Sequence, residues 1–432
     1  MQESRIIRHL LRLYGFFVFA VIFGSLGTEA RAEDTVHIIR EAAGDLEQLE
    51  AIEISDEEIS EWEIAESVQD TSNRASAAAN QFLNYSSNYG YQDMAKRSNG
   101  AGRQYVYQQL KTISRNFMVN GQDAGRKTYS GNTYYIAGVV DLSNYNLTNT
   151  EKAEIYFTFR HDNPQYFWLS NSVLYGSNSL IVLTYDEYRD GAVRQSTLEE
   201  IVQTAQKIYQ SAIDVSDSNY QKILKIHDAL IADIEYSQDT SIPTAHSIAG
   251  AMTSGKSAVC EGYAKVMQVM MNQYGIMNIY VTGTANGGGH AWNMVKMSDG
   301  RYYWLDATWD DQQYEEYQYQ YFLVGNANFI DHEADLSTGS GTNFLYELPQ
   351  ASEEDYVYDP ADDDRADFMP GDVNEDGEVN VKDLQIILRG VCEKIELTER
   401  QKMIADIVAD GKVDIQDLQK ELRFVCGKIE VL

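Results

Sequence analysis

Apolar positions recur every three to four residues in two parts of the chain, a spacing that places them on one face of a helix. The first part, residues 197–235, has these positions at Leu198, Ile201, Ala205, Ile208, Ile223, Ile226 and Leu230. The second part, SAVCEGYAKVMQVMMNQYGI at 257–276, has apolar or aromatic side chains at 259, 263, 266, 267, 270 and 274. We therefore expect helices in both parts, and we expect the second helix to be buried.

Three strand-like runs follow the second helix, namely MNIYVTGTA, HAWNMVKM and RYYWLDATW. The last two runs are separated by Ser298-Asp299-Gly300, a short turn that is typical of a hairpin. A helix packed on an antiparallel sheet follows from this order. The sequence therefore predicts an α+β fold for the core, which we place at residues 196–346.

The part before this core has weaker patterns. Residues 75–195 open like a helix (SAAANQFLNYSSNY) and continue with the strand-like runs TYYIAGVVDL, AEIYFTFRHD and SLIVLTYDEY, which predicts a small α/β accessory module. Residues 33–74 are acidic and have little periodicity apart from one weak helix near 56–67. We interpret them as a mobile leader. A propeptide is conceivable there, although no residue pattern demonstrates one.

Residues 1–32 have the pattern of a secretory signal peptide. Arg5, Arg8 and Arg12 lead into the apolar run LYGFFVFAVIFGSLG, and Ala30-Arg31-Ala32 offers a small-x-small cleavage site. A retained membrane anchor is the alternative, and the short apolar run argues against it. The net charge of −32 argues against binding to nucleic acid or to an anionic membrane. We therefore predict a secreted, extracellular or surface-associated protein without stable membrane insertion once the signal is removed.

The C-terminal part is duplicated. After an acidic, proline-punctuated linker at 347–370, DLQIILRGVCEKIE at 383–396 aligns without gaps with DLQKELRFVCGKIE at 417–430, at an offset of 34 residues. Each copy follows a loop in which oxygen-bearing residues have the spacing of a calcium loop. An acidic surface turn is the competing interpretation. The duplication predicts a separate module at residues 371–432.

The two loops differ in their ligands. The first, DVNEDGEVNVKD, offers Asp372, Asn374, Asp376, Glu378 through its backbone carbonyl, Asn380 and Asp383. The second, DIVADGKVDIQD, offers Asp406, Asp410, Lys412 through its backbone carbonyl, Asp414 and Asp417. Val408 stands where an oxygen ligand belongs, so we expect the second site to bind Ca²⁺ more weakly or to use a water in its place.

One of the three cysteines has neighbours that suggest catalysis. Cys260 lies in the first turn of the predicted buried helix, where free backbone N–H groups favour a thiolate. A buried structural cysteine is the competing interpretation. His290 follows three glycines and opens a strand, and Asp306 lies on the next strand. The hairpin would set these two side by side beneath the helix start, which would supply a nucleophile, a base and an orienting carboxylate.

The segment from about Tyr220 to His332 resembles the core of the transglutaminase-like superfamily, in its bacterial secreted branch. The matching motifs are AVCEGYAKVM, GHAWNMV and YYWLDATWDD, with KIHDALIADIEYS and AHSIAGAMTSGKSAVC upstream and YFLVGNANFIDH downstream. The resemblance implies a papain-like fold with Cys260, His290 and Asp306 as the catalytic triad. It also implies acyl transfer through a thioester on a protein or peptide substrate, without a catalytic cofactor.

The resemblance leaves the reaction open, because the superfamily includes crosslinkers, deamidases, peptidases and inactive members. We favour hydrolysis of an amide or peptide bond. The backbone N–H of Cys260 is a natural oxyanion donor. The second donor is not assigned, and His246 is a candidate only through its place in the upstream motif.

The duplicated tail resembles a type I dockerin, a small all-α module that binds the cohesin modules of scaffoldin proteins. This implies calcium-dependent attachment to a cellulosome-like or cell-surface assembly. Loop positions 10 and 11, which often contact the partner in dockerins, are Val381-Lys382 and Ile415-Gln416 here, so the cohesin type stays open. We expect the equivalent Cys392 and Cys426 either to pair or to be two buried thiols, with Cys260 as the odd, reactive cysteine.

Two other functions compete with this interpretation. The core could be a catalytically silent binding or structural module, so that only docking matters. The protein could also be a carbohydrate-active enzyme, since dockerins commonly tether such enzymes. No paired-carboxylate motif in the sequence supports that third interpretation.

Overall fold

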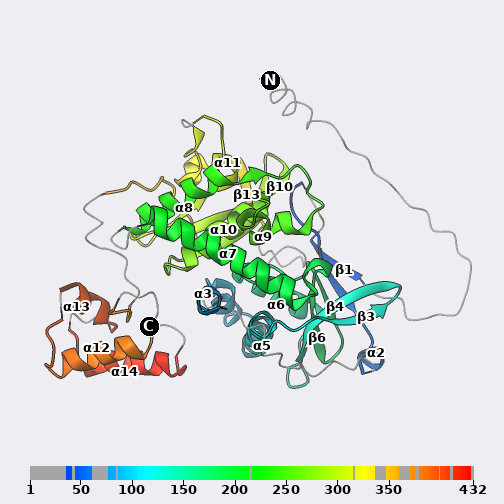
Figure 1. Ribbon diagram of the computed structural model, residues 1–432, viewed down its shortest axis with the longest axis horizontal. Helices are drawn as coiled ribbons and strands as arrows, with labels where there is room; N and C mark the ends of the chain where they lie inside the picture. Colours follow the sequence, from blue (N-terminus) through cyan, green and yellow to red (C-terminus); the bar gives the residue numbers. More distant parts are fainter. Residues whose placement is uncertain are drawn as a thin grey trace, which may run out of the picture. The chain divides into compact units, whose positions relative to one another are not determined.

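The computed structural model describes most of the chain after its N-terminal segment (Figure 1). The described residues are 36–40, 44–60, 76–83, 86–213, 217–314, 317–335, 347–359, 370–374, 379–397, 399–408 and 412–429. The predicted signal peptide lies outside them. Among the described helices, none is both long enough and apolar enough to span a membrane.

A six-stranded sheet has the strand order β1-β2-β5-β6-β4-β3. Its strands are β1 (Val36–Arg40), β2 (Leu49–Glu53), β3 (Gly125–Tyr129), β4 (Asn132–Asp141), β5 (Ser172–Tyr175) and β6 (Ser179–Thr184). Side chains alternate between its faces, so that Leu180 and Val182 enter the main core while Ile181 and Leu183 enter a second, smaller cluster. Helices α5 (Gly100–Val119) and α6 (Asn149–Asp162) pack on the face toward the main core.

A second sheet has five antiparallel strands in the order β12-β11-β10-β9-β13. Its strands are β9 (Asn278–Ala285), β10 (Gly288–Lys296), β11 (Tyr302–Leu305), β12 (Phe322–Val324) and β13 (His332–Ala334). The predicted hairpin is formed by β10 and β11, with Lys296 opposite Tyr302. Helix α10 (Cys260–Asn272) packs on β9 and β10, and all of its residues are buried. The prediction of an α+β fold with a helix on an antiparallel sheet is confirmed.

The two sheets share one hydrophobic core, which extends in sequence from Leu49 to Leu323. Helix α7 (Gly191–Ala212) runs between the two halves and contacts helices of both (Figure 1). The boundary that we expected at residues 195/196 therefore falls inside α7. The other described elements around this core are α2 (Asp56–Ser60), α3 (Ala77–Phe82), α4 (Tyr89–Met94), η2 (Asp186–Tyr188), α8 (Asn219–Asp233), β7 (Glu235–Tyr236), η3 (Pro243–His246), α9 (Ile248–Met252), β8 (Ser257–Ala258), α11 (Ala307–Asp310) and η5 (Asn326–Asn328).

The structure corrects the strand that we predicted at AEIYFTFRHD, which lies in α6. The helix begins with a capping box between Thr148 and Glu151. Every residue from Glu151 to Asp162 except Glu154 is buried, so the run shows neither the alternation of a half-buried strand nor an amphipathic helical period. Packing on all sides decided the conformation against the strand propensity of its aromatic and β-branched residues.

The predicted mobile leader at 33–74 is wrong for its described part from residue 44 to residue 60. Strand β2 pairs on one side with β1 and on the other with β5, and Leu46, Glu47 and Leu49 are buried. The acidic composition is misleading here because individual acidic groups have partners, such as the ion pair between Glu47 and Arg160.

The predicted linker at 347–370 is wrong in its first half. The backbone N–H of Ser352 donates to the carbonyl of Tyr302 over 2.8 Å, and that of Tyr356 donates to the carbonyl of Leu323 over 3.0 Å. The ring of Tyr358 stacks on Tyr220 with centroids 4.3 Å apart. Its tyrosines therefore dock this segment on the core, while residues 360–369 lie outside the described part.

The C-terminal module contains α12 (Val381–Val391), α13 (Glu399–Ala405) and α14 (Ile415–Val425) around a small apolar core. Cys392 and Cys426 are the C-cap residues of α12 and α14, and both thiols are free and exposed. The expectation that they pair, or that both are buried, is therefore wrong.

Asp162, at the end of α6, anchors α4 through hydrogen bonds. Its buried carboxylate accepts from the backbone N–H groups of Gly90 and Tyr91 over 3.2 Å each, and from the hydroxyl of Tyr107 over 2.9 Å. Burial raises its pKa to about 6 despite these hydrogen bonds. The carboxylate thus satisfies the first N–H groups of α4.

Replacing Asp162 by alanine should lower the free energy of unfolding by about 2–4 kcal/mol, because two buried N–H donors and a phenol lose their acceptor. Urea denaturation followed by circular dichroism measures this loss. The matched control is Asp141→Ala, which removes an exposed carboxylate whose partner is Ser143. Equal stability of the two variants would contradict the role assigned to Asp162.

Candidate active site

Cys260 is the first residue of α10, and its side chain is buried. The chain enters this helix from β8, which pairs in parallel with β7. Gly262 allows the close approach of the helix start to the neighbouring chain, since a Cβ there would lie 2.6 Å from the Cβ of Ala258 and 2.7 Å from the carbonyl of Ala245. The thiol is therefore fixed by backbone packing at the N-terminus of a buried helix.

His290 and Asp306 come together as the sequence predicted. The Nε2 atom of His290 lies 2.7 Å from Oδ2 of Asp306, and the imidazole lies close enough to Cys260 to oppose the rise that burial gives to the pKa of its thiol. The other carboxylate oxygen, Oδ1, accepts from the backbone N–H groups of Thr308 and Trp309 and so caps α11. The cap orients the carboxylate, and the carboxylate orients the imidazole.

The charges of the three groups are coupled. Burial alone would lower the pKa of His290, but the carboxylate of Asp306 raises it to about 10. Burial opposes ionisation of Asp306, yet the two neighbouring histidines hold its pKa well below its usual range. Burial raises the pKa of the Cys260 thiol, against the opposing effect of His290. The arrangement supplies a positively charged imidazole beside a thiol, which is the setting in which a thiolate becomes stable.

A second histidine at the same carboxylate was missed by the sequence analysis. The Nε2 atom of His332 lies 3.1 Å from Oδ2 of Asp306, and its Nδ1 atom lies 3.0 Å from Asp331. Its ring stacks on Phe329 with centroids 3.9 Å apart. The signal was the motif YFLVGNANFIDH, whose last residue is His332. The local pattern around His332 does not indicate that β13 brings this residue back to Asp306.

His290, Asp306 and His332 offer ligand atoms within 4.8 Å of one another, a grouping that could hold a metal ion. Both imidazoles bond the same carboxylate oxygen, and this sharing accounts for the spacing without a cation. We assign no metal to it.

His246 does not take the role for which the sequence made it a candidate. Its Nδ1 atom lies 2.7 Å from Oε2 of Glu261, and its Nε2 atom lies 2.8 Å from the carbonyl of Thr240. Both ring nitrogens are thus engaged, and neither is left to stabilise an oxyanion. His246 instead neutralises Glu261, a carboxylate that is buried in the first turn of α10 and also accepts from Tyr280 over 2.7 Å.

The two loops of the C-terminal module close on their last carboxylates in the same way. Asp383 accepts from the backbone N–H groups of Asn374 and Asn380 over 3.0 Å each. Asp417 accepts from those of Val408 and Asp414 over 2.9 and 2.8 Å. Both carboxylates are buried.

The oxygen donors in the described parts of these loops fit a hard cation such as Ca²⁺. The predicted ligands in these parts are Asp372, Asn374, Asn380, Asp383, Asp406, Lys412, Asp414 and Asp417. Asp376, Glu378 and Asp410 lie outside the described residues. Val408 offers no side-chain oxygen, which is the difference that the sequence predicted between the two loops.

Changing Asp306 to asparagine should lower the pKa of His290 from about 10 toward its ordinary 6.5, because the anion that stabilises the imidazolium is lost. The asparagine oxygen can still cap α11. In the unchanged protein the imidazolium contributes stability that is complete below about pH 6.5 and is lost as the pH rises through about 10.

Nitrogen-15 NMR of the imidazoles across pH 5–11 measures this pKa. Asp299→Asn is the matched control, because Asp299 lies in the turn of the same hairpin and contacts Arg301 and Tyr303. An unchanged titration of His290 in Asp306→Asn would show that Asp306 does not set its charge.

Two parts of the chain match known families. Residues 204–307 match the Transglutaminase-like superfamily, and residues 370–420 match the Dockerin type I domain. The comparison with curated proteins gave no match. A solved structure described as "Crystal structure of a TGase" matches at 17% identity and a TM-score of 0.23, over 26% of this chain and 31% of that chain. That likeness is too slight to carry an argument.

The family matches contain the residues described above. The first match includes Cys260, His290 and Asp306, and the second includes both duplicated loops. His332 lies beyond the first match. The chain therefore carries a transglutaminase-like domain and, after it, a type I dockerin domain.

Proposed function

We propose that the protein is a secreted, cysteine-dependent enzyme that transfers acyl groups from protein amide bonds, with hydrolysis as the favoured outcome. The observation that carries this proposal is the grouping of Cys260, His290 and Asp306 at the start of a buried helix, where His290 bonds Asp306 and acts on the pKa of the thiol. A nucleophile, a base and an orienting carboxylate in this order are the parts that thioester chemistry needs.

Each residue has one role in the proposed reaction. The Cys260 thiolate attacks the amide carbonyl, and the new S–C bond forms as the C–N bond breaks. His290 gives its proton to the departing amine, and Asp306 holds the imidazole in place. Water, or a primary amine as the alternative acceptor, then attacks the thioester and releases the thiol.

The oxyanion of this reaction would be stabilised by the backbone N–H of Cys260 at the helix start. The phenol of Tyr236 is close enough to Cys260 for the two groups to affect each other electrostatically, and its burial raises its pKa above the usual range and keeps it protonated. Its hydroxyl donates to Oδ2 of Asp45. We propose Tyr236 as the second donor, in the role for which His246 was a candidate, once Asp45 has moved away and released its hydroxyl.

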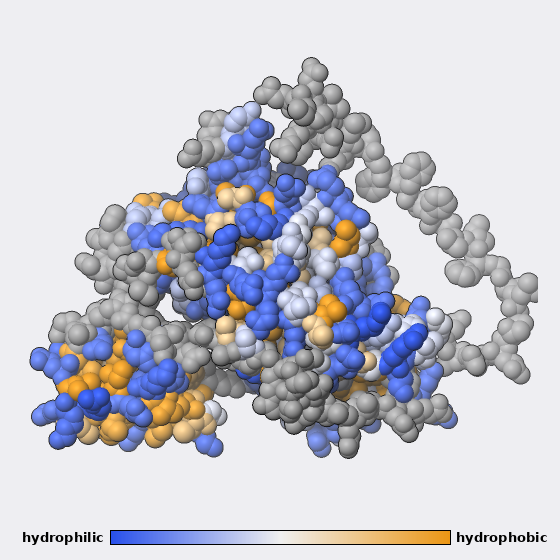
Figure 2. Space-filling model, in the orientation of Figure 1, coloured by the Kyte–Doolittle hydropathy of each residue, from blue (hydrophilic) through white to orange (hydrophobic). Residues whose placement is uncertain are grey.

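The dockerin domain supplies the proposed attachment to a cohesin module in a cellulosome-like or cell-surface assembly. Apolar side chains gather on its surface around α12 and α14 (Figure 2). Val381 is 54% exposed and Ile415 is 53% exposed, and these residues are equivalent in the two copies. Leu388 and Leu422 form a second exposed, equivalent pair. Duplicated apolar positions of this kind suit a partner surface.

Calcium is the proposed structural cofactor of this domain, held by the oxygen donors of the two loops. When bound, the ion would neutralise carboxylates that the fold gathers at each loop. We propose no cofactor for the acyl transfer itself.

The mature chain from Glu33 onward, incubated with an unstructured protein and a labelled primary amine, should give products that the Cys260→Ala variant does not give. Mass spectrometry separates the reaction types: fragments indicate a peptidase, and label on intact glutamines indicates a transglutaminase. Identical products from both proteins on several substrates would favour the catalytically silent, scaffold-docked module instead.

Calcium titration of the Asp383→Asn and Asp417→Asn variants should remove different sites. The first variant should lose the tighter of two binding events, and the second should lose the weaker, because the second loop carries Val408 in a ligand position. Isothermal calorimetry measures both events, and each variant is the matched control of the other. Loss of the weaker event in Asp383→Asn would reverse the proposed order.

A further inference from the structure

The chain itself lies across the candidate active site. Residues 44–48, which we term the strap, connect to β2 and run over the start of α10. The side chain of Leu46 is buried in one cluster with Cys260, Ala264, Tyr280 and Ala291. Nearly the whole of this small cluster belongs to the helix start and the two strands beneath it. Leu46 therefore fills an apolar space directly beside the nucleophile.

The backbone of the strap makes contacts along both sides of the site. The N–H of Asp45 donates to the carbonyl of Gly289, the residue before His290, over 3.4 Å. The thiol of Cys260 donates to the carbonyl of Asp45 over 3.8 Å. Two residues on, the N–H of Glu47 donates to Oε2 of Glu261 over 3.2 Å. These are contacts that any extended peptide could make, because they use main-chain groups of the strap.

Gly44 shows how close the strap lies to the catalytic loop. Its φ of +58° is in the left-handed region, and a Cβ there would lie 2.6 Å from the backbone nitrogen of Gly289. A larger residue at either position would push the strap away.

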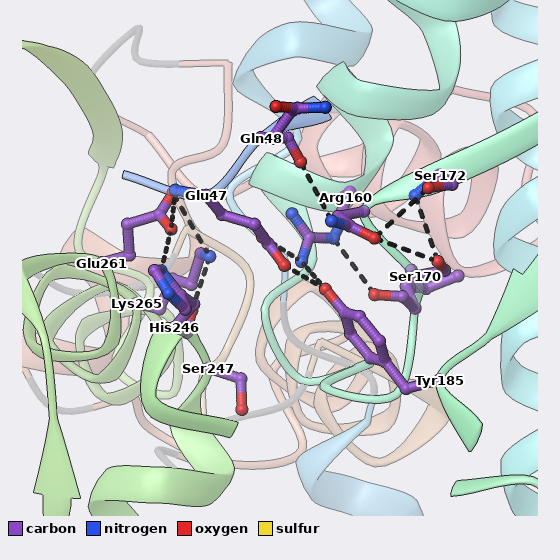
Figure 3. A network of polar contacts seen from close by, with 12 residues as sticks. Glu47, Gln48, Arg160, Ser170, Ser172, Tyr185, His246, Ser247, Glu261 and Lys265 are labelled. Atoms are coloured by element: carbon purple, nitrogen blue, oxygen red, sulfur yellow. Dashed lines mark hydrogen bonds and ion pairs between the residues drawn. The ribbon is translucent and has the colours of Figure 1, made fainter. Parts of the chain in front are cut away.

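The side chain of Glu47 enters a buried polar pocket (Figure 3). Its Oε2 atom lies 2.7 Å from Nη2 of Arg160, and the hydroxyl of Tyr185 donates to its Oε1. Arg160 is held by the carbonyl of Leu169 through Nε, while its buried Nη1 has no hydrogen-bond partner among the described residues. The pocket thus presents a fixed guanidinium and a phenol to a carboxylate, with donor capacity to spare.

With the strap in place, the thiol of Cys260 is not accessible to a substrate. The Cys260 side chain has no exposed surface, and its thiol is bonded to the strap. Burial raises the thiol pKa, which disfavours the reactive thiolate. An amide substrate cannot reach Sγ without moving Leu46. The same contacts that would bind a peptide here are made by the protein's own chain.

We propose that the space beside Cys260 that the strap fills, here called the cleft, is a binding site for an extended polypeptide with an acidic side chain. The strap (residues 44–48) occupies this cleft and blocks it, and in this role we call it the latch. Arg160 and Tyr185 form the carboxylate pocket of this site. The proposal rests on the proposed acyl-transfer function and narrows its substrate class to polypeptides that carry an apolar residue followed by an acidic one. Tethering gives the latch a high effective concentration, so a substrate gains access when the latch is weakened or displaced.

The first test measures access to the thiol in the full mature chain. Glu47→Gln removes the charge held by Arg160, and Leu46→Ala removes the apolar contact with Cys260. Both variants should increase the rate of iodoacetamide labelling at Cys260 by about tenfold or more, because each shifts the latch toward its open state. Peptide-level mass spectrometry reads Cys260 separately, and the exposed Cys392 serves as an internal standard.

Glu53→Gln is the matched control, since Glu53 lies at the end of β2 and contacts Asn149 rather than the cleft. Thermal unfolding verifies that the variants are folded. If Cys260 is labelled at the unchanged rate in both Glu47→Gln and Leu46→Ala, the latch is overturned. Two variants are used because Glu47→Gln leaves a buried guanidinium with a neutral partner and could lose stability.

The second test asks whether the cleft takes the peptide in trans. The synthetic peptide AGDLEQLE, which is residues 43–50, should protect Cys260 of the Glu47→Gln protein from labelling in a saturable way. The same peptide with glutamine at the position of Glu47 should need about tenfold more for equal protection. A control peptide with glutamine at the position of Glu50 has the same net charge as the peptide with glutamine at the position of Glu47. This control should protect Cys260 as well as the original peptide does.

Equal protection by all three peptides, or protection by none, would overturn the carboxylate pocket. These readouts measure access to the thiol and do not require turnover. If they succeed while Cys260-dependent products are absent, the proposed reaction fails and the peptide site stands. If products form while Cys260 is equally accessible in all variants, the latch fails and the reaction stands.

Discussion

The burial of α10 against β9 and β10 is the constraint on which the candidate site depends. On a helix that is buried along its whole length, a polar side chain costs free energy unless it has a partner. Lys265 donates to the carbonyl of His246 over 2.7 Å, and Asn293 of β10 donates to the carbonyl of Ala264 over 2.9 Å. These bonds fix the rotation and depth of the helix. Cys260 therefore meets His290 because of how the rest of α10 packs.

The same constraint explains why the site depends on residues far from it in sequence. The carboxylate of Glu261 in the first turn needs partners, and it finds them in His246, Tyr280 and the backbone of Glu47. These partners come from three separate parts of the chain. The helix start thus contacts η3, β9 and the N-terminal strap, and the carboxylate of Glu261 connects a change in any of them to the neighbouring Cys260.

Local patterns were sufficient to predict the centre of the site. Cys260, His290 and Asp306 lie within one helix and one hairpin, whose periods and turn are visible in the sequence. The two predicted calcium loops are local in the same sense. The helix α6 could not be predicted because burial on nearly all sides erases the period. The strap could not be predicted because its contacts join residues 214 positions apart, and no local pattern encodes such a pairing.

Strand β2 has a consequence for how this chain folds. It lies between β1 and β5, and the strap that precedes it rests on residues that are synthesised more than two hundred positions later. Non-local pairings of this kind close late, since the entropy of a long loop must be lost before its contacts form. Strand β2 can complete its sheet once β5 has been synthesised, but the strap can reach its place only after Cys260 and Gly289 have been made. Acidic residues along β2 disfavour its association with other chains while it is not yet paired with β5.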